Sequence, residues 1–182
     1  CVAAYSVLTL AYCLALKRVL LLDAITIAAG FVLRAVAGAV AIQVYISHWL
    51  VVCTFSLAMF LALGKRLYEL HLLGDNAELH RKVLFDYSEG LLKSAILATG
   101  LITLATYALY TVYPLMGTPA RHAGLILTLP LVALGLGRYT HLVFRRRSGG
   151  CPSETLLSDR LLLLIIAVWA VTVYLLFELA KR

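Results

Sequence analysis

The chain has 182 residues, of which 63% are hydrophobic and 14% are charged, and its mean hydropathy is +0.95. Soluble domains carry about 45–50% apolar and about 25% charged residues, so this composition excludes an ordinary soluble globular protein. The net charge of +7 suits an anionic partner. Because the basic residues flank apolar runs, we expect membrane lipid headgroups or a phosphorylated substrate rather than nucleic acid.

About six apolar stretches follow one another, most of them near the ~20 residues that a helix needs to cross the hydrocarbon core. In chain order they are 1–16, which is short, 24–45, 49–63, 91–113, 123–144 and 161–179. None shows the strict alternation of a strand, and an open sheet would leave backbone groups unpaired in lipid. The sequence therefore predicts an all-α, multi-spanning membrane bundle that forms a single transmembrane domain over residues 1–182.

The loops between these stretches alternate in charge, which predicts an orientation. One set of connections holds Lys17, Arg18, Lys65, Arg66, Arg81, Lys82, Arg145, Arg146, Arg147 and Arg160, whereas the opposite set holds Arg121, Lys181 and Arg182. By the positive-inside rule, the first set faces the cytoplasm. We expect a multi-pass protein of the cell (inner or plasma) membrane, with its site loops on the cytoplasmic face.

Arg34 is the charge that lies deepest in a predicted span. A charged side chain at the centre of a membrane helix costs about 2.5–3.5 kcal/mol on insertion scales, so it calls for an explanation. Asp23 precedes Arg34 by about three helical turns, which places both residues on one helix face. We predict that Arg34 lines an internal polar cavity that binds an anion. The alternative is a structural arginine paired with a carboxylate or with backbone carbonyls.

Lys65, Arg66 and Glu69 form a charged cluster at the end of the third stretch. Lys65 and Glu69 share a helix face at i,i+4. On composition alone, simple capping of the span by basic residues is the better explanation of the cluster. The polar loop that follows, 68–90, adds acids and bases that suit cation and phosphate binding.

Arg138 and Tyr139 lie late in the fifth stretch, a turn or two inside its end. Pro130 is predicted to kink this helix and open space beside Arg138. Ser158 and Asp159 precede the last stretch, and either can cap that helix. The residue types together predict a cationic polar site on the cytoplasmic side, which suits a phosphorylated substrate. They do not choose between a transferase and a transporter.

Several blocks resemble a known family. They are GFVLRAVAGA at 30–39, KRLYEL at 65–70, HRKVLFDYSEGLL at 80–92 and the region 127–169. These are similar to the decaprenyl-phosphate phosphoribosyltransferases of the UbiA prenyltransferase superfamily. The resemblance implies a bundle of about nine spanning helices around a cavity open to the cytoplasm, of which this chain forms about the last six. It also implies an enzyme that moves 5-phosphoribose from 5-phosphoribosyl 1-pyrophosphate to a polyprenyl phosphate, making a decaprenylphosphoryl-5-phosphoribose precursor of the arabinan cell envelope.

The resemblance also implies roles for individual residues, carried over by position. Phosphate binding falls to Lys17, Arg34, Lys65, Arg66 and Arg138, and supporting polar roles fall to Asp23, Glu69, Tyr87 and Tyr139. Mg²⁺ is expected to hold the pyrophosphate while cationic side chains offset its charge. Glu69 is the candidate metal ligand in this chain. The superfamily's first Asp-rich motif is missing here, so we expect the main ligands upstream and expect this chain to be a C-terminal fragment that is nearly inactive alone.

Two alternatives stay open. The chain is also compatible with a UbiA-type prenyltransferase that acts on an aromatic or lipid acceptor. The basic KRLYEL block in place of an aspartate-rich motif argues against this alternative. A non-enzymatic membrane transporter subunit would need charges through the membrane midplane, and Arg34 alone lies at a suitable depth.

Overall fold

The computed structural model describes residues 20–43, 46–73, 89–112, 123–145 and 159–179. These residues form α2 (Leu20–Ala41), α3 (His48–Leu73), α5 (Glu89–Val112), the 3₁₀ helix η4 (Ala123–Thr128), α6 (Leu129–Arg145) and α8 (Arg160–Leu179). All the regular structure within them is helical, and five helices are long and apolar enough to cross a membrane. The predicted all-α membrane bundle is thus confirmed. The predicted span 1–16, Lys17 and Tyr87 lie outside the described residues.

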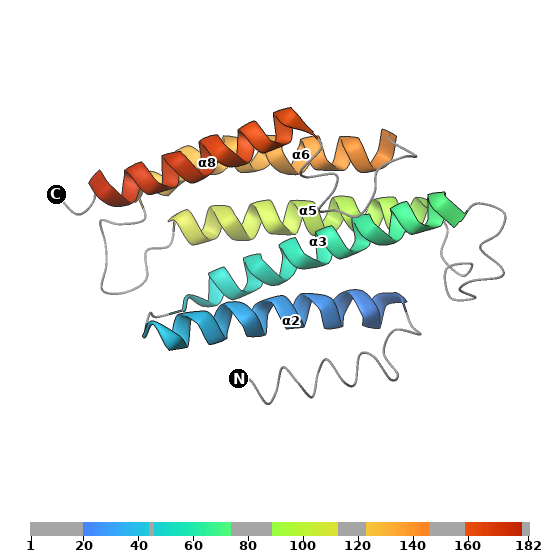
Figure 1. Cartoon of the computed structure of the whole chain (residues 1–182), viewed down its shortest axis with the longest axis horizontal. Helices are drawn as coiled ribbons and strands as arrows, with labels where there is room; N and C mark the ends of the chain where they lie inside the picture. Colours follow the sequence, from blue (N-terminus) through green and yellow to red (C-terminus); the bar gives the residue numbers. More distant parts are fainter. Residues whose placement is uncertain (1–19, 44–45, 74–88, 113–122, 146–158, 180–182) are drawn as a thin grey trace.

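The helices lie side by side and run in alternating directions (Figure 1). Helix α3 packs against α2, α5 and α6, while α8 lies on α6 and η4. Because successive helices reverse direction, the starts of α2, α5 and α8 and the ends of α3 and α6 share one end of the bundle, on the right in Figure 1. The helix ends that border the connections predicted to be cytoplasmic therefore lie together.

The core lies where α3 meets α2 and α5. Phe60 and Leu67 of α3 are buried there with Leu92 and Ile96 of α5. Elsewhere large apolar side chains stay uncovered, and on α8 only 6% of the most apolar window is buried. An apolar surface of this extent indicates lipid contact, because soluble monomers rarely expose large apolar patches.

Hydroxyl side chains inside the helices bond to their own backbone. Ser56, Thr103 and Thr106 each donate to the carbonyl four residues earlier, at 2.8 Å. A hydroxyl in an apolar surrounding is costly without a partner, so these local bonds make the residues compatible with a membrane interior.

The fifth predicted span is two helical segments rather than one kinked helix. The 3₁₀ helix η4 ends at Thr128, and α6 begins at Leu129 with Pro130 as its second residue. A proline in the first turn of a helix loses no backbone hydrogen bond, because the first amide groups have no partner there. Pro130 therefore lies at the change of helix type and does not interrupt α6.

Candidate functional site

Most charged residues of the described ranges lie in the half of the bundle where α2, α5 and α8 begin and α3 and α6 end. This half holds Lys65, Arg66, Lys93, Arg138, Arg145 and Arg160, together with the acids Asp23, Glu69, Glu89 and Asp159. Among the lysines and arginines in the described ranges, Arg34 alone lies elsewhere, near the middle of α2. The charge pattern of the sequence is therefore also a pattern in space.

Arg66 is the centre of a buried ionic cluster between α2 and α3. One terminal nitrogen of its guanidinium, Nη2, pairs with Asp23 Oδ2, and the other, Nη1, donates to Glu69 Oε2. The side chains of Arg66 and Asp23 are 3% and 1% exposed, and that of Glu69 is 27% exposed. We call Asp23, Arg66 and Glu69 the buried triad. All three residues were predicted site residues, and the tertiary fold brings Asp23 of α2 to Arg66 of α3.

The buried triad does not satisfy all of its own polar atoms. Within the described residues, Asp23 Oδ1 and Arg66 Nε have no hydrogen-bond partner, although both are buried. Buried polar groups are normally bonded, since an unmet donor or acceptor costs about 1–3 kcal/mol. The described residues therefore leave part of the hydrogen-bonding capacity of this ion pair unused, and Lys65 lies next to it in the sequence, half-buried.

Tyr139 connects α6 to the same segment of α3. Its side chain is 3% exposed, and its ring lies 5.1 Å from that of Phe60, centroid to centroid. A methyl group on Gly64 would lie 2.6 Å from Tyr139 Oη, which is closer than real contacts allow. Only glycine at position 64 lets the tyrosine pack this tightly beside Lys65. Sequence reasoning singled out Tyr139 but missed Gly64, because no local pattern reveals a contact between distant helices.

Arg138 pairs with Asp159 rather than with the buried triad. Its Nη2 lies 2.8 Å from Asp159 Oδ2, and its Nε lies 3.5 Å from Oδ1. Asp159 Oδ1 also accepts from the backbone amide of Leu162 at 2.9 Å, so the predicted cap of the last helix is confirmed. This arrangement ties α6 to the start of α8, which is a structural role for Arg138.

Arg34 lies on an exposed part of α2, with its guanidinium carbon 5.5 Å from the centre of the Phe31 ring. At a rise of 1.5 Å per residue it lies roughly 16 Å along the helix from Asp23. The two residues share a helix, as predicted, but Asp23 is buried against α3 whereas Arg34 is not. The structure thus brings Asp23, Arg66 and Glu69 together, but not Arg34.

His71 and Glu89 join the end of α3 to the start of α5. His71 Nε2 lies 3.1 Å from Glu89 Oε1, and Lys93 Nζ lies 2.6 Å from the same oxygen. A carboxylate in the first turn of a helix is favourable because it faces the positive end of the helix dipole. Sequence reasoning named Glu89 among the loop acids but not this contact.

The described residues do not form a metal centre by themselves. They contain no group of three or more His, Cys, Asp or Glu side chains that could hold an ion. Glu69, the predicted ligand, is bonded to Arg66, as is Asp23. A Mg²⁺ ion prefers several oxygen ligands in octahedral geometry, and two carboxylates already paired with an arginine do not provide it.

Comparisons with known proteins agree on one family name. A decaprenyl-phosphate phosphoribosyltransferase of Mycolicibacterium smegmatis is 30% identical, across 94% of this chain and 55% of that protein. The enzymes of the same name from Corynebacterium glutamicum and Mycobacterium tuberculosis are 27% and 26% identical, across 92% and 93% of this chain. The resemblance that the sequence blocks predict is thus confirmed along nearly the whole chain.

The chain spans about half the length of these curated relatives, between 50% and 55%. No protein-family model matches the chain.

Proposed function

We propose that this chain is part of a membrane transferase that moves 5-phosphoribose from 5-phosphoribosyl 1-pyrophosphate to a polyprenyl phosphate. The observation that supports this most is the buried triad, which keeps unmet polar atoms inside a membrane bundle. It lies beside Lys65 in the half of the bundle where the other charges gather. The relatives that match this chain carry a name that describes the same transfer.

In the proposed reaction, an oxygen of the lipid phosphate attacks C1 of the ribose. The new bond joins C1 to that oxygen, and the bond between C1 and the pyrophosphate oxygen breaks. Negative charge therefore builds up on the leaving pyrophosphate. Fixed cations at that position lower the barrier, because charge stabilisation is usually the largest single contribution to catalysis.

Arg66 and Lys65 are the cations best placed for this role. The two carboxylates hold the Arg66 guanidinium in one orientation, so little reorganisation is needed when the phosphates bind. Both terminal nitrogens of Arg66 are paired with these carboxylates, so its Nε is the donor that remains for a phosphate oxygen. Asp23, Glu69 and Tyr139 would position it.

Lys17, Arg34, Arg138 and Tyr87 complete the proposed set of phosphate-binding and supporting residues. Lys17 and Tyr87 rest on the resemblance alone, since they lie outside the described residues. Arg34 and Arg138 lie on the exposed part of α2 and beside Asp159, so we propose that they make weaker contributions than Arg66. A role for Mg²⁺ also rests on the resemblance. We further propose that the charged half of the bundle faces the cytoplasm of a cell membrane.

The test uses the gene product that contains this chain, purified into lipid nanodiscs. It is supplied with radiolabelled 5-phosphoribosyl 1-pyrophosphate and a polyprenyl phosphate, and label in the lipid fraction is counted. We expect label in the lipid, and Lys65→Ala is expected to reduce the rate by more than about tenfold. Arg160→Ala removes a charge at the same end of the bundle, outside the proposed site, and serves as the matched control.

Lipid that stays unlabelled, together with prenyl transfer from a polyprenyl pyrophosphate to an aromatic acceptor, would assign the chain to the other branch of the superfamily. Full activity of Lys65→Ala would remove Lys65 from the site.

A further inference from the structure

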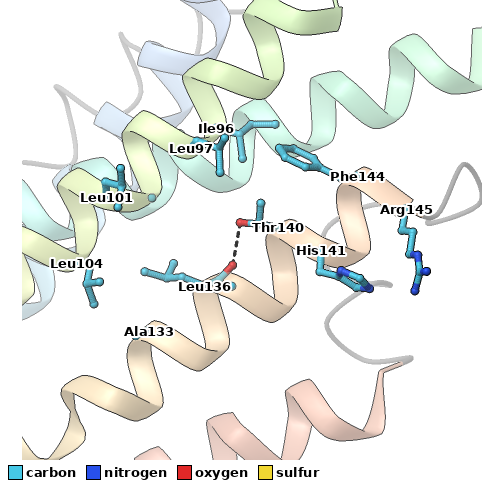
Figure 2. A pocket seen from close by; sticks show the side chains of 12 residues that line it. Ile96, Leu97, Leu101, Leu104, Ala133, Leu136, Thr140, His141, Phe144 and Arg145 are labelled. Carbon is cyan, nitrogen blue, oxygen red and sulfur yellow. Dashed lines mark hydrogen bonds between the residues drawn. The ribbon is translucent and has the colours of Figure 1, made fainter.

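A groove of about 600 Å³ runs between α5 and α6 (Figure 2). Its walls are mainly apolar and include Leu97, Leu101 and Leu104 of α5, with Ala133 and Leu136 facing them from α6. Leu97 and Leu101 are 49% and 68% exposed, so the groove opens on the surface that would meet lipid. Binding sites for small ligands have about this volume, roughly 300–1,000 Å³.

One end of this groove is cationic. His141 and Arg145 of α6 line that end, and both are exposed (Figure 2). Lys93 of α5 lies at the same end, since its Nζ is 5.7 Å from the centre of the ring of Phe144, which also lines the groove. Glu89 offsets the charge of Lys93, because its Oε1 lies 2.6 Å from Nζ. None of the ion pairs between described residues uses Arg145, so this end keeps a positive charge.

The polar group between the apolar walls is already satisfied. Thr140 donates its hydroxyl hydrogen to the carbonyl of Leu136 at 2.8 Å, as the dashed line in Figure 2 shows. An occupant of the groove therefore needs no polar group along its length. Its chemistry is that of an apolar chain with an anionic head at the Arg145 end.

Packed side chains separate this groove from the buried triad. A methyl group on Gly100 in the groove wall would lie 3.2 Å from Phe60 Cε2, so the wall rests against Phe60. The Phe60 ring in turn packs on Tyr139, with 5.1 Å between the ring centres. A head group bound at Arg145 is thus kept apart from Arg66. A lipid held in the groove is therefore outside the proposed reaction.

We propose that the α5–α6 groove binds an anionic phospholipid of the membrane, with one acyl chain along the apolar walls and the phosphate at Arg145 and His141. Such a lipid is not a substrate, so this inference goes beyond the proposed function and does not depend on it. Charge complementarity favours this occupant, because basic pockets between membrane helices bind the head groups of anionic lipids. A zwitterionic lipid gains less, since its head group also carries a cation. The lateral opening lets the acyl chain stay in the hydrocarbon.

Thermal unfolding tests the preference for an anionic head group. The gene product that contains this chain is purified in detergent, and phosphatidylglycerol or phosphatidylcholine with the same acyl chains is added. A ligand that binds only the folded state raises Tm by mass action. We expect the larger rise with phosphatidylglycerol, corresponding to a Kd about tenfold lower. An equal rise with the two lipids would overturn the proposal, because the cationic end would then have no role.

Gly137 offers a way to fill the groove. It lines the groove, and a Cβ at this position would meet nothing within 4 Å, so Gly137→Phe places its ring in open space. Gly38 of α2 also has nothing within 4 Å and lies outside the groove, which makes Gly38→Phe the matched control. We expect Gly137→Phe to lose the rise in Tm with phosphatidylglycerol and Gly38→Phe to keep it. A full rise in Gly137→Phe would contradict the proposal.

The cationic end is tested with the same two lipids. Arg145→Gln is expected to lower the preference for phosphatidylglycerol over phosphatidylcholine about fivefold, since the cation that distinguishes the head groups is lost. Arg160→Gln removes the same charge at the same end of the bundle but outside the groove, so its preference is expected to match that of the unmodified protein. An unchanged preference in Arg145→Gln would overturn the placement of the phosphate.

Direct occupancy is measured on the unmodified protein, so it does not depend on the folding of a variant. Phosphatidylglycerol with a diazirine in one acyl chain is incorporated into nanodiscs with the protein, and the cross-linked peptides are identified by mass spectrometry. We expect labels on the groove-lining residues of α5 and α6, competition by unlabelled phosphatidylglycerol, and weaker competition by phosphatidylcholine.

Three results of the cross-linking experiment would overturn the proposal. Equal competition by glycerol phosphate, which has no acyl chain, would make this an anion site that does not use the groove. Equal competition by polyprenyl phosphate would make the groove a substrate site. Absence of label on α5 and α6 would show that another part of the gene product covers the groove. None of these readouts is phosphoribosyl transfer, so a failure of the proposed function would leave this proposal unaffected.

Discussion

Two arginine–aspartate pairs lie in the charged half of this bundle, and they differ in every respect that bears on function. Arg66 and Asp23 are both buried, share the arginine with Glu69, and keep atoms without partners. Arg138 is 35% exposed, and its partner Asp159 also caps α8. The second pair is fully explained by holding two helices together, whereas the first pair is not.

The difference shows how burial separates a structural role from a functional one. In the Arg138–Asp159 pair the arginine is 35% exposed and only the aspartate is buried, so forming the pair costs less desolvation than burying both partners. A buried pair must be desolvated, and it stabilises the fold only when all its polar atoms are bonded. Arg66 and Asp23 do not meet that condition within the described residues. We therefore propose that the reaction takes place at α2 and α3, and expect the α6–α8 pair to support it.

The largest effect is expected for Arg66. Replacing it by alanine removes the central cation, so phosphoribosyl transfer should fall by about 10²–10³-fold. Arg66→Lys keeps the charge but loses the forked geometry, and it should recover only part of this loss. The measurement is the initial rate of lipid labelling in nanodiscs. A rate for Arg66→Ala within twofold of that of the unmodified protein would remove Arg66 from the proposed site.

Asp23→Ala is expected to give the next largest effect, on stability. The change leaves Arg66 buried beside a single carboxylate, and breaking a buried pair in this way costs about 3–5 kcal/mol. Thermal unfolding in detergent should show a clear fall in Tm. Asp159→Ala is the comparison variant, for which loss of a helix cap costs about 1 kcal/mol. An equal fall in Tm for Asp23→Ala and Asp159→Ala would show that burial does not distinguish the two arginine–aspartate pairs.

Gly64→Ala is expected to have an intermediate effect. The added methyl group would meet Tyr139 Oη at 2.6 Å, and overpacking of this kind costs about 1–3 kcal/mol. Gly38→Ala, which meets nothing within 4 Å, serves as the control. Tyr139→Phe removes the nearest atom, Tyr139 Oη. The double variant Gly64→Ala/Tyr139→Phe should therefore lose less stability than Gly64→Ala alone. If Tyr139→Phe gives no such relief, the contact does not position the segment around Lys65.

The smallest effect is expected for Arg138→Ala. Asp159 keeps its bond to the Leu162 amide, so stability should fall by no more than about 1 kcal/mol. Transfer activity should fall by less than about tenfold, well short of the loss in Arg66→Ala. Stability is measured by thermal unfolding in detergent, and transfer activity by the initial rate of lipid labelling in nanodiscs. A loss in Arg138→Ala as large as that in Arg66→Ala would place the phosphates at α6 as well.

Sequence reasoning identified many of the site residues but only part of their pairing. The charges at Lys65, Arg66 and Glu69 stood out because an apolar span ends there. Periodicity then placed Asp23 and Arg34 on one face, which suggested that these two belong together. The structure pairs Asp23 with Arg66 instead. A helical repeat defines which face a residue lies on, but it does not define which helix covers that face.

Composition and hydropathy by themselves determined that this is a helical membrane protein with its charges at one end, because lipid admits few other solutions. Local rules also predicted a cap at Ser158 or Asp159, since a helix start needs a nearby acceptor, and the structure assigns it to Asp159. Only the tertiary structure decided that Arg66 joins two acids, that Gly64 admits Tyr139, and that α5 and α6 leave a groove. These features depend on how the helices pack against one another. Packing depends on the shapes of side chains far apart in the sequence, which no local pattern records.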